Sequence, residues 1–233
     1  MFARIEAQYN SPNDSPYDVG RRRNDPPAAR KQRQPRMESD PTLLRWVQAT
    51  LDGDQEAFAE IVYSFTDAVY NLCYRMLSNR EEAEDATQET FIRAHRALSS
   101  YDSSRPFKTW LLSIASNHCI DRIRKRRVQY LSLDDPVASE ATLSLSSDEP
   151  TPEEATLDHE RERLIGRLMN ELPGEYRAAV VLRYWYDYSY QEIAEALSTT
   201  ESAIKSRLFR ARQMLADRLE LLSKPARSRL QES

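Results

Sequence analysis

Apolar residues recur every three or four positions along most of the chain from residue 42 to residue 222, which is the spacing of amphipathic helices. The clearest run predicts one long helix and consists of Phe58, Ile61, Val62, Phe65, Val69, Leu72 and Met76. Asp54 follows the Asp52-Gly53 turn and is placed to cap the start of this helix. The pattern therefore favours an all-α protein.

Two more helices are predicted in the same half of the chain. Asn79, with Glu82 three positions later, forms a capping-box pattern and predicts a helix from Asn79 to about Ser99. Pro106 is tolerated in a first turn and predicts the start of a third helix. The residues that this helix is expected to bury are Phe107, Trp110, Leu111, Ile114 and Cys119. We expect these helices to form one compact bundle over residues 38–130.

The helical periodicity stops over residues 131–157 and returns afterwards. Nine carboxylates and no Lys or Arg lie between Leu131 and Glu160, among many Ser, Thr and Pro residues, which is typical of an acidic flexible linker. Helical spacing resumes over residues 158–222 and leaves 223–233 as a short tail. The predicted fold class is all-α, with two small helical bundles joined by the acidic linker.

The first 37 residues differ from both bundles. They carry eight basic and four acidic groups with almost no apolar periodicity, so we expect a disordered basic extension. Met37 begins the segment that is predicted to fold. Two interpretations of the residues before it stay open: translation starts at Met37, or these residues form a genuine basic tail. The formal net charge of −4 therefore hides an alternation of basic, acidic and basic segments.

The second bundle contains the spacing of a helix-turn-helix. A short helix is predicted over residues 190–197, a turn over 198–200 and a longer helix over 201–215. The residues expected to clamp the two helices together are Ile193, Ala194, Leu197, Ala203, Ile204 and Leu208. Ser198 stands where such turns often place a glycine in the left-handed conformation. The arrangement leaves one face of the longer helix free.

That free face combines cations and hydroxyls, which phosphates and base edges require in a major groove. The candidate residues for duplex DNA are Thr200, Ser202, Lys205, Ser206, Arg207, Phe209, Arg210 and Arg212. The alternative is an ordinary solvated helix face, since any surface helix carries Lys and Arg.

The third helix of the first bundle offers a different nucleic-acid surface. Its residues 122–127 hold five cations, and aromatic residues lie at its start, which suits the unstacked bases and the backbone of single-stranded DNA. The candidates are Tyr101, Phe107, Lys108, Thr109, Ser113, Asn117, Arg122, Arg124, Lys125, Arg126 and Arg127. Ser116 falls on the same stripe, whereas Trp110 is better explained as a core residue.

The second helix of the first bundle presents an acidic strip with an apolar edge, which suits a basic protein partner. The strip consists of Glu81, Asp85, Gln88, Glu89 and Ile92. A solvated charged face explains the same pattern, so this alternative also stays open.

Several classes of protein are disfavoured. The longest apolar run, residues 178–182, is far shorter than the ~20 residues of a membrane span, and the first thirty residues have no signal core, so we expect a cytoplasmic protein. Cys73 and Cys119 lack a CxxC partner and are read as buried thiols. The histidines, His95, His118 and His159, are scattered. We therefore expect no metal, no cofactor and no enzymatic activity.

Taken together, the motifs resemble the extracytoplasmic-function (group IV) sigma factors of bacterial RNA polymerase, in the sigma-70 superfamily. Residues 53–58 (GDQEAF) resemble the family's opening helix, 83–91 (AEDATQETF) region 2.2 and 106–117 region 2.3. Residues 172–177 (LPGEYR) and 190–212 resemble regions 4.1 and 4.2. Ser198 and Ala203 depart from the usual glycine and threonine. The resemblance implies that region 2 occupies residues 38–130 and region 4 residues 158–222.

The resemblance also implies partners for each surface. The acidic strip would dock on the coiled coil of the polymerase β′ clamp, and the β flap would be a second contact with the core enzyme. The single-strand candidates would capture the melted minus-ten element, and the duplex candidates would read the minus-thirty-five element. The acidic linker would thread toward the RNA exit path, and an anti-sigma factor is a usual partner in this family.

Two other functions compete with a sigma factor. The chain could be an autonomous helix-turn-helix regulator whose first bundle senses or dimerises, and this hypothesis predicts tight operator binding without polymerase. It could also be an adaptor that uses only the acidic strip, but this would leave the basic stripe and the helix-turn-helix without a purpose. The presence of two DNA-facing bundles in this order favours promoter recognition.

Overall fold

The computed structural model describes residues 41–132 and 157–223, and in these ranges all regular structure is helical. The predicted extension and most of the predicted linker and tail lie outside the described residues. Helix α5 includes residues 131 and 132, so it runs two residues into the segment predicted as linker. None of the helices in the described ranges has the length and hydropathy needed to cross a bilayer.

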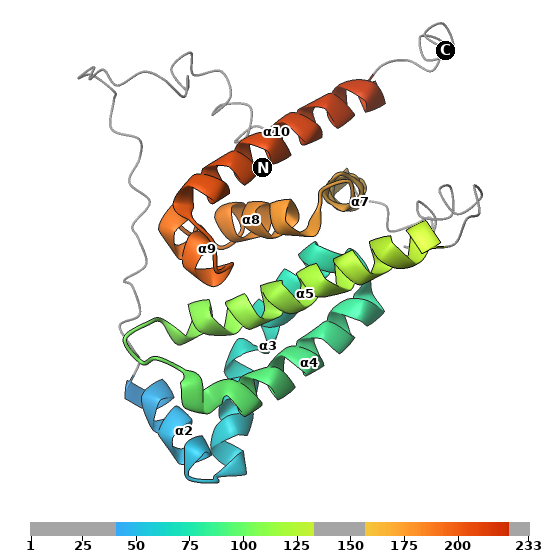
Figure 1. Cartoon of the computed structure of the whole chain (residues 1–233). Coiled ribbons are helices and arrows are strands. Elements are labelled where there is room, and N and C mark those ends of the chain that lie inside the picture. The colour runs from blue at the N-terminus through green and yellow to red at the C-terminus, as the bar shows by residue number, and fades with distance from the viewer. Residues whose placement is uncertain (1–40, 133–156, 224–233) are drawn as a thin grey trace, which may run out of the picture. The chain divides into compact units, whose positions relative to one another are not determined.

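The N-terminal bundle consists of α2 (Pro41–Leu51), α3 (Gln55–Leu77), α4 (Arg80–Ala97), a 3₁₀ turn η1 (Leu98–Ser100) and α5 (Phe107–Ser132). Helices α3, α4 and α5 pack against one another, and α2 packs on α3 (Figure 1). The predicted apolar face of α3 supplies much of the core, including Ile61, Leu72 and Met76, which are fully buried. Leu111 and Leu112 of α5 complete it.

Local capping fixes where these helices begin. The Asp54 carboxylate accepts hydrogen bonds from the backbone N–H groups of Glu56 and Ala57, at 2.9 and 3.2 Å, which confirms its predicted role. Asn79 accepts from the N–H of Glu82 at 2.9 Å, also as predicted. The Glu82 carboxylate, however, lies with arginines of α5, because two cations there attract it more strongly than a backbone N–H.

The C-terminal bundle consists of α7 (Leu157–Asn170), α8 (Gly174–Tyr184), α9 (Tyr190–Ala196) and α10 (Glu201–Ser223). Ser189 and Glu192 form a full capping box at the start of α9. Helices α9 and α10 follow the predicted helix-turn-helix order, and Ile193 and Ile204 are buried where they pack. Ser198 adopts a left-handed conformation with φ of 49°, as its position predicts.

Helix α8 packs against both α3 and α5, so the two bundles are in direct contact (Figure 1). A Cβ atom on Gly174 would lie 3.4 Å from the Cα of Ile120, which is van der Waals distance, so the backbones of α8 and α5 approach closely here. The Tyr186 hydroxyl donates a hydrogen bond of 2.6 Å to the carbonyl of Ala68. The Arg75 guanidinium lies 4.7 Å from the centre of the Trp185 ring.

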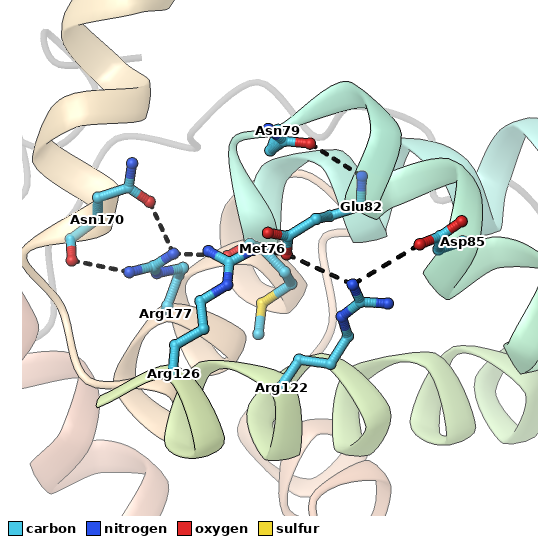
Figure 2. A network of polar contacts seen from close by, with 8 residues as sticks. All are labelled: Met76, Asn79, Glu82, Asp85, Arg122, Arg126, Asn170 and Arg177. Carbon is cyan, nitrogen blue, oxygen red and sulfur yellow. Dashed lines mark hydrogen bonds and ion pairs between the residues drawn. The ribbon is translucent and has the colours of Figure 1, made fainter. Parts of the chain in front are cut away.

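Arg177 of α8 lies at the centre of this contact and is only 4% exposed (Figure 2). Its guanidinium donates hydrogen bonds of 2.6 Å to the carbonyl of Met76 and 2.8 Å to that of Asn170. These two carbonyls belong to the last turns of α3 and α7, where backbone acceptors lack helical partners and the helix dipole is negative. The ends of two helices from different bundles therefore share one cation.

Candidate interfaces with nucleic acid and protein

The acidic strip lies on α4, as predicted. The side chains of Glu81, Asp85, Gln88 and Ile92 are exposed and that of Glu89 is half-buried. Glu89 forms an ion pair of 2.7 Å with Arg93, and this hydrogen bond holds the pKa of its carboxyl below the ordinary value. The strip is therefore accessible, and one of its carboxylates is already neutralised by its own helix.

Beside the strip, α3 and α4 enclose an apolar hollow of about 430 Å³. Its lining residues are Val62, Thr66, Tyr70, Glu84, Thr87, Gln88, Phe91 and Ile92. Gln88 and Ile92 belong to both the strip and the hollow, and Ile92 is 46% exposed despite being apolar. The surface therefore offers a docking partner an apolar anchor site next to carboxylates, a combination that protein interfaces commonly use.

An aromatic cluster stands at the start of α5. The ring centroids of Tyr101, Phe107 and Trp110 are 5.1 to 5.2 Å apart. Phe107 is 2% exposed and also packs against Phe65, so its predicted burial is confirmed. Because it is buried, its inclusion among the candidate contacts to single-stranded DNA was wrong. Tyr101 and Trp110 are half-buried and present the accessible rings. Trp110 was expected to be a core residue, but the cluster leaves its ring partly open. Burial also raises the pKa of the Tyr101 hydroxyl, which donates to the carbonyl of Arg105 at 2.6 Å.

The polar stripe predicted along α5 is only partly open. Asn117 is exposed, but Ser116 is fully buried, because its position on the helix faces the core, so including it in the stripe was wrong. Ser113 donates a hydrogen bond of 2.6 Å to the carbonyl of Trp110. Lys108 lies 5.7 Å from the centre of the Tyr186 ring, which belongs to the C-terminal bundle.

Thr109 also faces the C-terminal bundle. Its hydroxyl lies beside Tyr188, where burial raises the pKa of the phenol and the interaction with Thr109 partly offsets that rise. The first turn of α5, a predicted single-strand surface, is therefore covered in part by the segment between α8 and α9.

The five cations of residues 122–127 fall into two groups. Arg122 lies 3.7 Å from Glu82 and 3.9 Å from Asp85, and Arg126 forms an ion pair with Glu82 (Figure 2). Arg124 forms ion pairs with Asp121 and Glu175. The side chains of Lys125 and Arg127 are exposed. Three of the five predicted phosphate contacts therefore have carboxylate partners in this structure.

The duplex candidates gather on α10. Ser202, Lys205, Ser206, Phe209 and Arg210 are exposed, while Arg207 and Arg212 are half-buried. Thr200 precedes the helix, and its hydroxyl accepts a hydrogen bond of 3.2 Å from the N–H of Ala203. Its position as a helix cap would orient the end of α10 that recognition helices commonly present to base edges.

A polar hollow of about 330 Å³ lies between α8 and α10. It is lined by Glu175, Tyr176, Ala203, Ser206, Arg207 and Arg210. Ala203 was expected between α9 and α10, but it is half-buried and lines this hollow. A small side chain at this position keeps the hollow open beside two arginines, which suits a phosphate group.

Sequence reasoning missed the residues of the C-terminal bundle that contact the N-terminal bundle: Glu175, Arg177, Tyr186 and Tyr188. Glu175 and Arg177 belong to the LPGEYR motif, which was the available signal. Burial alone would raise the pKa of the Glu175 carboxyl, but hydrogen bonds from its own backbone N–H and from Arg124 outweigh burial and lower it. Within the described ranges, no group of three or more His, Cys, Asp or Glu residues could hold a metal ion.

Comparison with known proteins gives the same division of the chain. The family model described as Sigma-70 region 2 matches residues 61–128, and the one described as Sigma-70, region 4 matches residues 162–215. The chain is 43% identical over 171 residues to the ECF RNA polymerase sigma factor SigW of Bacillus subtilis, which covers 72% of this chain and 91% of that protein. It is 32% identical over 193 residues to the RNA polymerase sigma-H factor of Pseudomonas aeruginosa, with 81% and 98% covered.

A solved structure has the same fold. The sigma factor RpoE of Bartonella quintana, crystallised in complex with the anti-sigma factor NepR, matches with a TM-score of 0.53 and 24% identity over 70% of this chain and 96% of that one. Three observations indicate the same family: the two family models, the identity to known sigma factors over most of their length, and the two helical bundles. The chain belongs to the extracytoplasmic-function sigma factors of the sigma-70 family.

Proposed function

We propose that this chain is a promoter-specificity subunit of RNA polymerase that binds the core enzyme, recognises two promoter elements and holds the melted strand during initiation. The observation that supports the proposal is that one chain carries both sigma-70 regions, with an apolar hollow beside carboxylates on α4, an aromatic cluster at the start of α5 and exposed cations on α10. It supplies no reacting group of its own in this proposal, and it acts in the cytoplasm, where bacterial polymerase works.

The α4 surface is assigned to the core enzyme. Its carboxylates attract a basic partner, and the adjacent hollow accepts an apolar side chain. The clamp coiled coil of β′ is the partner implied by the family, with the β flap as a second contact for the C-terminal bundle. Because Ile92 is exposed, Ile92→Asp should abolish core binding while leaving the thermal unfolding of the chain unchanged.

The two DNA surfaces are assigned by the state of DNA that each suits. The exposed cations and hydroxyls of α10 match a major groove, so α10 reads the minus-thirty-five element as duplex. Tyr101, Trp110 and Asn117 offer rings and an amide for extruded bases, so the start of α5 holds the minus-ten strand. Lys125 and Arg127 bind its backbone.

An anti-sigma factor is the expected regulator, since the RpoE structure contains one. Such a partner would compete with the polymerase core for the exposed surfaces of α4 or α10. Co-purification of a tagged chain from its native host, followed by competition with purified core enzyme, would test this part of the proposal.

The central experiment is abortive transcription with purified core enzyme on a library of promoter fragments, with and without the chain. Initiation that depends on the chain and enriches paired upstream and minus-ten sequences is the expected result. Ile92→Asp should remove it, whereas Tyr63→Asp, a change at a more exposed residue of α3 that does not line the hollow, should not. No initiation, together with salt-sensitive binding of the chain alone to a duplex site, would indicate an autonomous regulator instead.

A further inference from the structure

Two cysteines lie together in the core of the N-terminal bundle and have no part in the function proposed above. Cys73 belongs to α3 and Cys119 to α5, and both are fully buried free thiols. The packing of α3 against α5 brings them side by side, and the two thiols form a hydrogen bond with each other. Two thiols in direct contact can close into a disulfide with little movement of the chain.

The two thiols differ in how readily they lose a proton. The hydrogen bond from Cys119 lowers the pKa of the Cys73 thiol, and this effect outweighs burial, which raises it. The same hydrogen bond and burial both raise the pKa of the Cys119 thiol. Because the thiolate and not the thiol is the nucleophile, Cys73 is the member that attacks and Cys119 is the member that keeps its proton.

Two hydroxyls of α4 are placed to stabilise a thiolate at Cys73. Thr87 and Thr90 both lie within hydrogen-bond reach of its sulfur. Each hydroxyl now donates to the carbonyl four positions earlier in its own helix, at 2.7 and 2.6 Å. A hydroxyl proton can rotate between acceptors, so either residue can donate to the sulfur once Cys73 is ionised. Helix α4 therefore contributes to the reactivity of a residue on α3.

Thr87 also connects the pair of thiols to the surface. It is one of the residues that line the apolar hollow between α3 and α4, and it is 7% exposed. One threonine side chain therefore separates this hollow from the sulfur of Cys73. Hydrogen peroxide is an uncharged molecule only slightly larger than water, so a hollow of about 430 Å³ has ample room for it beside this barrier.

We propose that Cys73 and Cys119 form a peroxide-reactive dithiol behind this hollow, in which Cys73 reacts first and Cys119 then closes a disulfide between α3 and α5. The Cys73 thiolate attacks one oxygen of hydrogen peroxide and the O–O bond breaks, which leaves a sulfenic acid and a hydroxide that takes up the proton lost by Cys73. The sulfur of Cys119 attacks the sulfenic sulfur, the S–O bond breaks, and the departing hydroxyl takes up the Cys119 proton. Two thiols thereby lose two electrons, and one peroxide is reduced to two waters.

The disulfide acts on the hollow from the side of the core. It joins its sulfurs at about 2.05 Å, closer than any hydrogen bond, so closure draws α3 toward α5. Closure also consumes the Cys73 thiol that Thr87 contacts, and both α3 and Thr87 form walls of the hollow. Oxidation should therefore weaken the binding of the core enzyme at this site. This last step rests on the function proposed above, whereas the chemistry of the dithiol does not.

The first test treats the full chain with hydrogen peroxide in the absence of polymerase. Cys73 and Cys119 are its only cysteines, so titration of free thiols in the denatured product and mass spectrometry of its peptides report this pair alone. The expected product is a disulfide that links the two residues within one chain and that dithiothreitol reverses. Disulfides only between chains, or two free thiols after an exposure that fully oxidises cysteine in a small peptide, would overturn the proposal.

Single variants separate the roles of the two thiols. Cys119→Ala removes the resolving thiol, so the reaction should stop at a sulfenic acid on Cys73 that dimedone traps. Cys73→Ala removes the attacking thiol and should lower the oxidation rate of Cys119 about tenfold. Thermal unfolding of the reduced variants shows that each is folded before treatment. Oxidation of Cys119 at the wild-type rate in Cys73→Ala would contradict the order of attack.

The route through the hollow is tested at Thr87. Thr87→Ser keeps the hydroxyl and removes a methyl group, so it thins the barrier and should raise the oxidation rate about threefold. Thr50→Ser makes the same change at a buried threonine of α2 that also donates to the carbonyl four positions earlier, and it should leave the rate unchanged. An oxidation rate that rises in proportion to the unfolded fraction in low urea would overturn the hollow as the route.

The last test adds purified core enzyme to the reduced and to the oxidised chain. Oxidation should weaken core binding about fivefold, and dithiothreitol should restore it. Cys73→Ala is the control for damage elsewhere in the chain, and it should bind core enzyme equally before and after peroxide. Equal binding by the reduced and oxidised wild type would overturn the effect on docking. Failure of both forms to bind core enzyme would contradict the proposed function and leave the dithiol chemistry in place.

Discussion

Arg124 Nη2 lies 3.1 Å from Glu175 Oε1, although the two residues are 51 positions apart in the sequence. The pair is largely exposed, and exposed ion pairs contribute only ~0–1 kcal/mol to stability. Its importance is therefore its position, because a carboxylate of the C-terminal bundle occupies the guanidinium that we propose as a contact to a DNA phosphate. The contact joins a residue of the single-strand surface to the motif LPGEYR.

Removing the Glu175 carboxylate should strengthen the binding of single-stranded DNA to the chain. Glu175→Gln is expected to increase the affinity of the full chain for a minus-ten oligonucleotide by up to about fivefold, the range of an exposed ion pair. Fluorescence anisotropy with a labelled oligonucleotide would measure this. Glu171→Gln, at an exposed residue paired with Arg218 of α10, is the control and should leave the affinity unchanged.

Arg177 should not tolerate lysine. Lysine keeps the charge but lacks the planar fork that reaches the carbonyls of Met76 and Asn170 together, so Arg177→Lys is expected to destabilise the chain by about 2–3 kcal/mol. Urea unfolding followed by circular dichroism would measure the loss. Arg167→Lys, at an exposed position of α7, should change the free energy of unfolding by less than about 0.5 kcal/mol. An equally stable Arg177→Lys protein would show that the charge alone is sufficient.

The exposed arginine of the recognition helix should contribute to upstream binding. Arg210→Ala is expected to weaken holoenzyme binding to a duplex carrying the minus-thirty-five element at least tenfold, through the loss of a base-edge or phosphate contact. If the contact is to phosphate, the slope of log affinity against log salt should fall by about one. Arg163→Ala removes the same charge from an exposed position on α7 and should leave the binding intact. Normal promoter binding by Arg210→Ala would refute the assignment of α10.

His118 should make the stability of the chain depend on pH. Burial lowers the pKa of this imidazole, and the cations of Arg93 and Arg122 lower it further, against smaller opposite effects from Glu89 and Asp121. Since the folded state binds the proton less readily than the unfolded state, stability is present above the ordinary value of about 6.5 and is lost as the pH falls toward the lowered pKa.

Comparison of urea midpoints at pH 7.5 and pH 5.5 tests this expectation. The midpoint of the wild type should fall more than that of His118→Leu over this interval. His95→Leu keeps His118 and should retain the pH dependence of the wild type. If both leucine variants and the wild type lose the same stability, other groups account for the change.

The sequence by itself determined the elements of this protein. The apolar face of α3, the cap at Asp54 and the left-handed Ser198 were all predictable, because each depends on residues within a few positions of one another. The same reasoning gave the helix-turn-helix order, since its spacing is local. The family followed from motifs that are contiguous in the chain.

Only the tertiary structure decided which of these residues are available. Phe107 and Trp110 were both expected in the core, yet packing buries the first and leaves the second accessible in part. Arg177 bonds to Met76, 101 positions away, and Arg124 pairs with Glu175. Helical periodicity specifies one face of one helix but not which other helix covers it. The partners of Arg177 and Arg124 therefore depend on how the two bundles pack against each other.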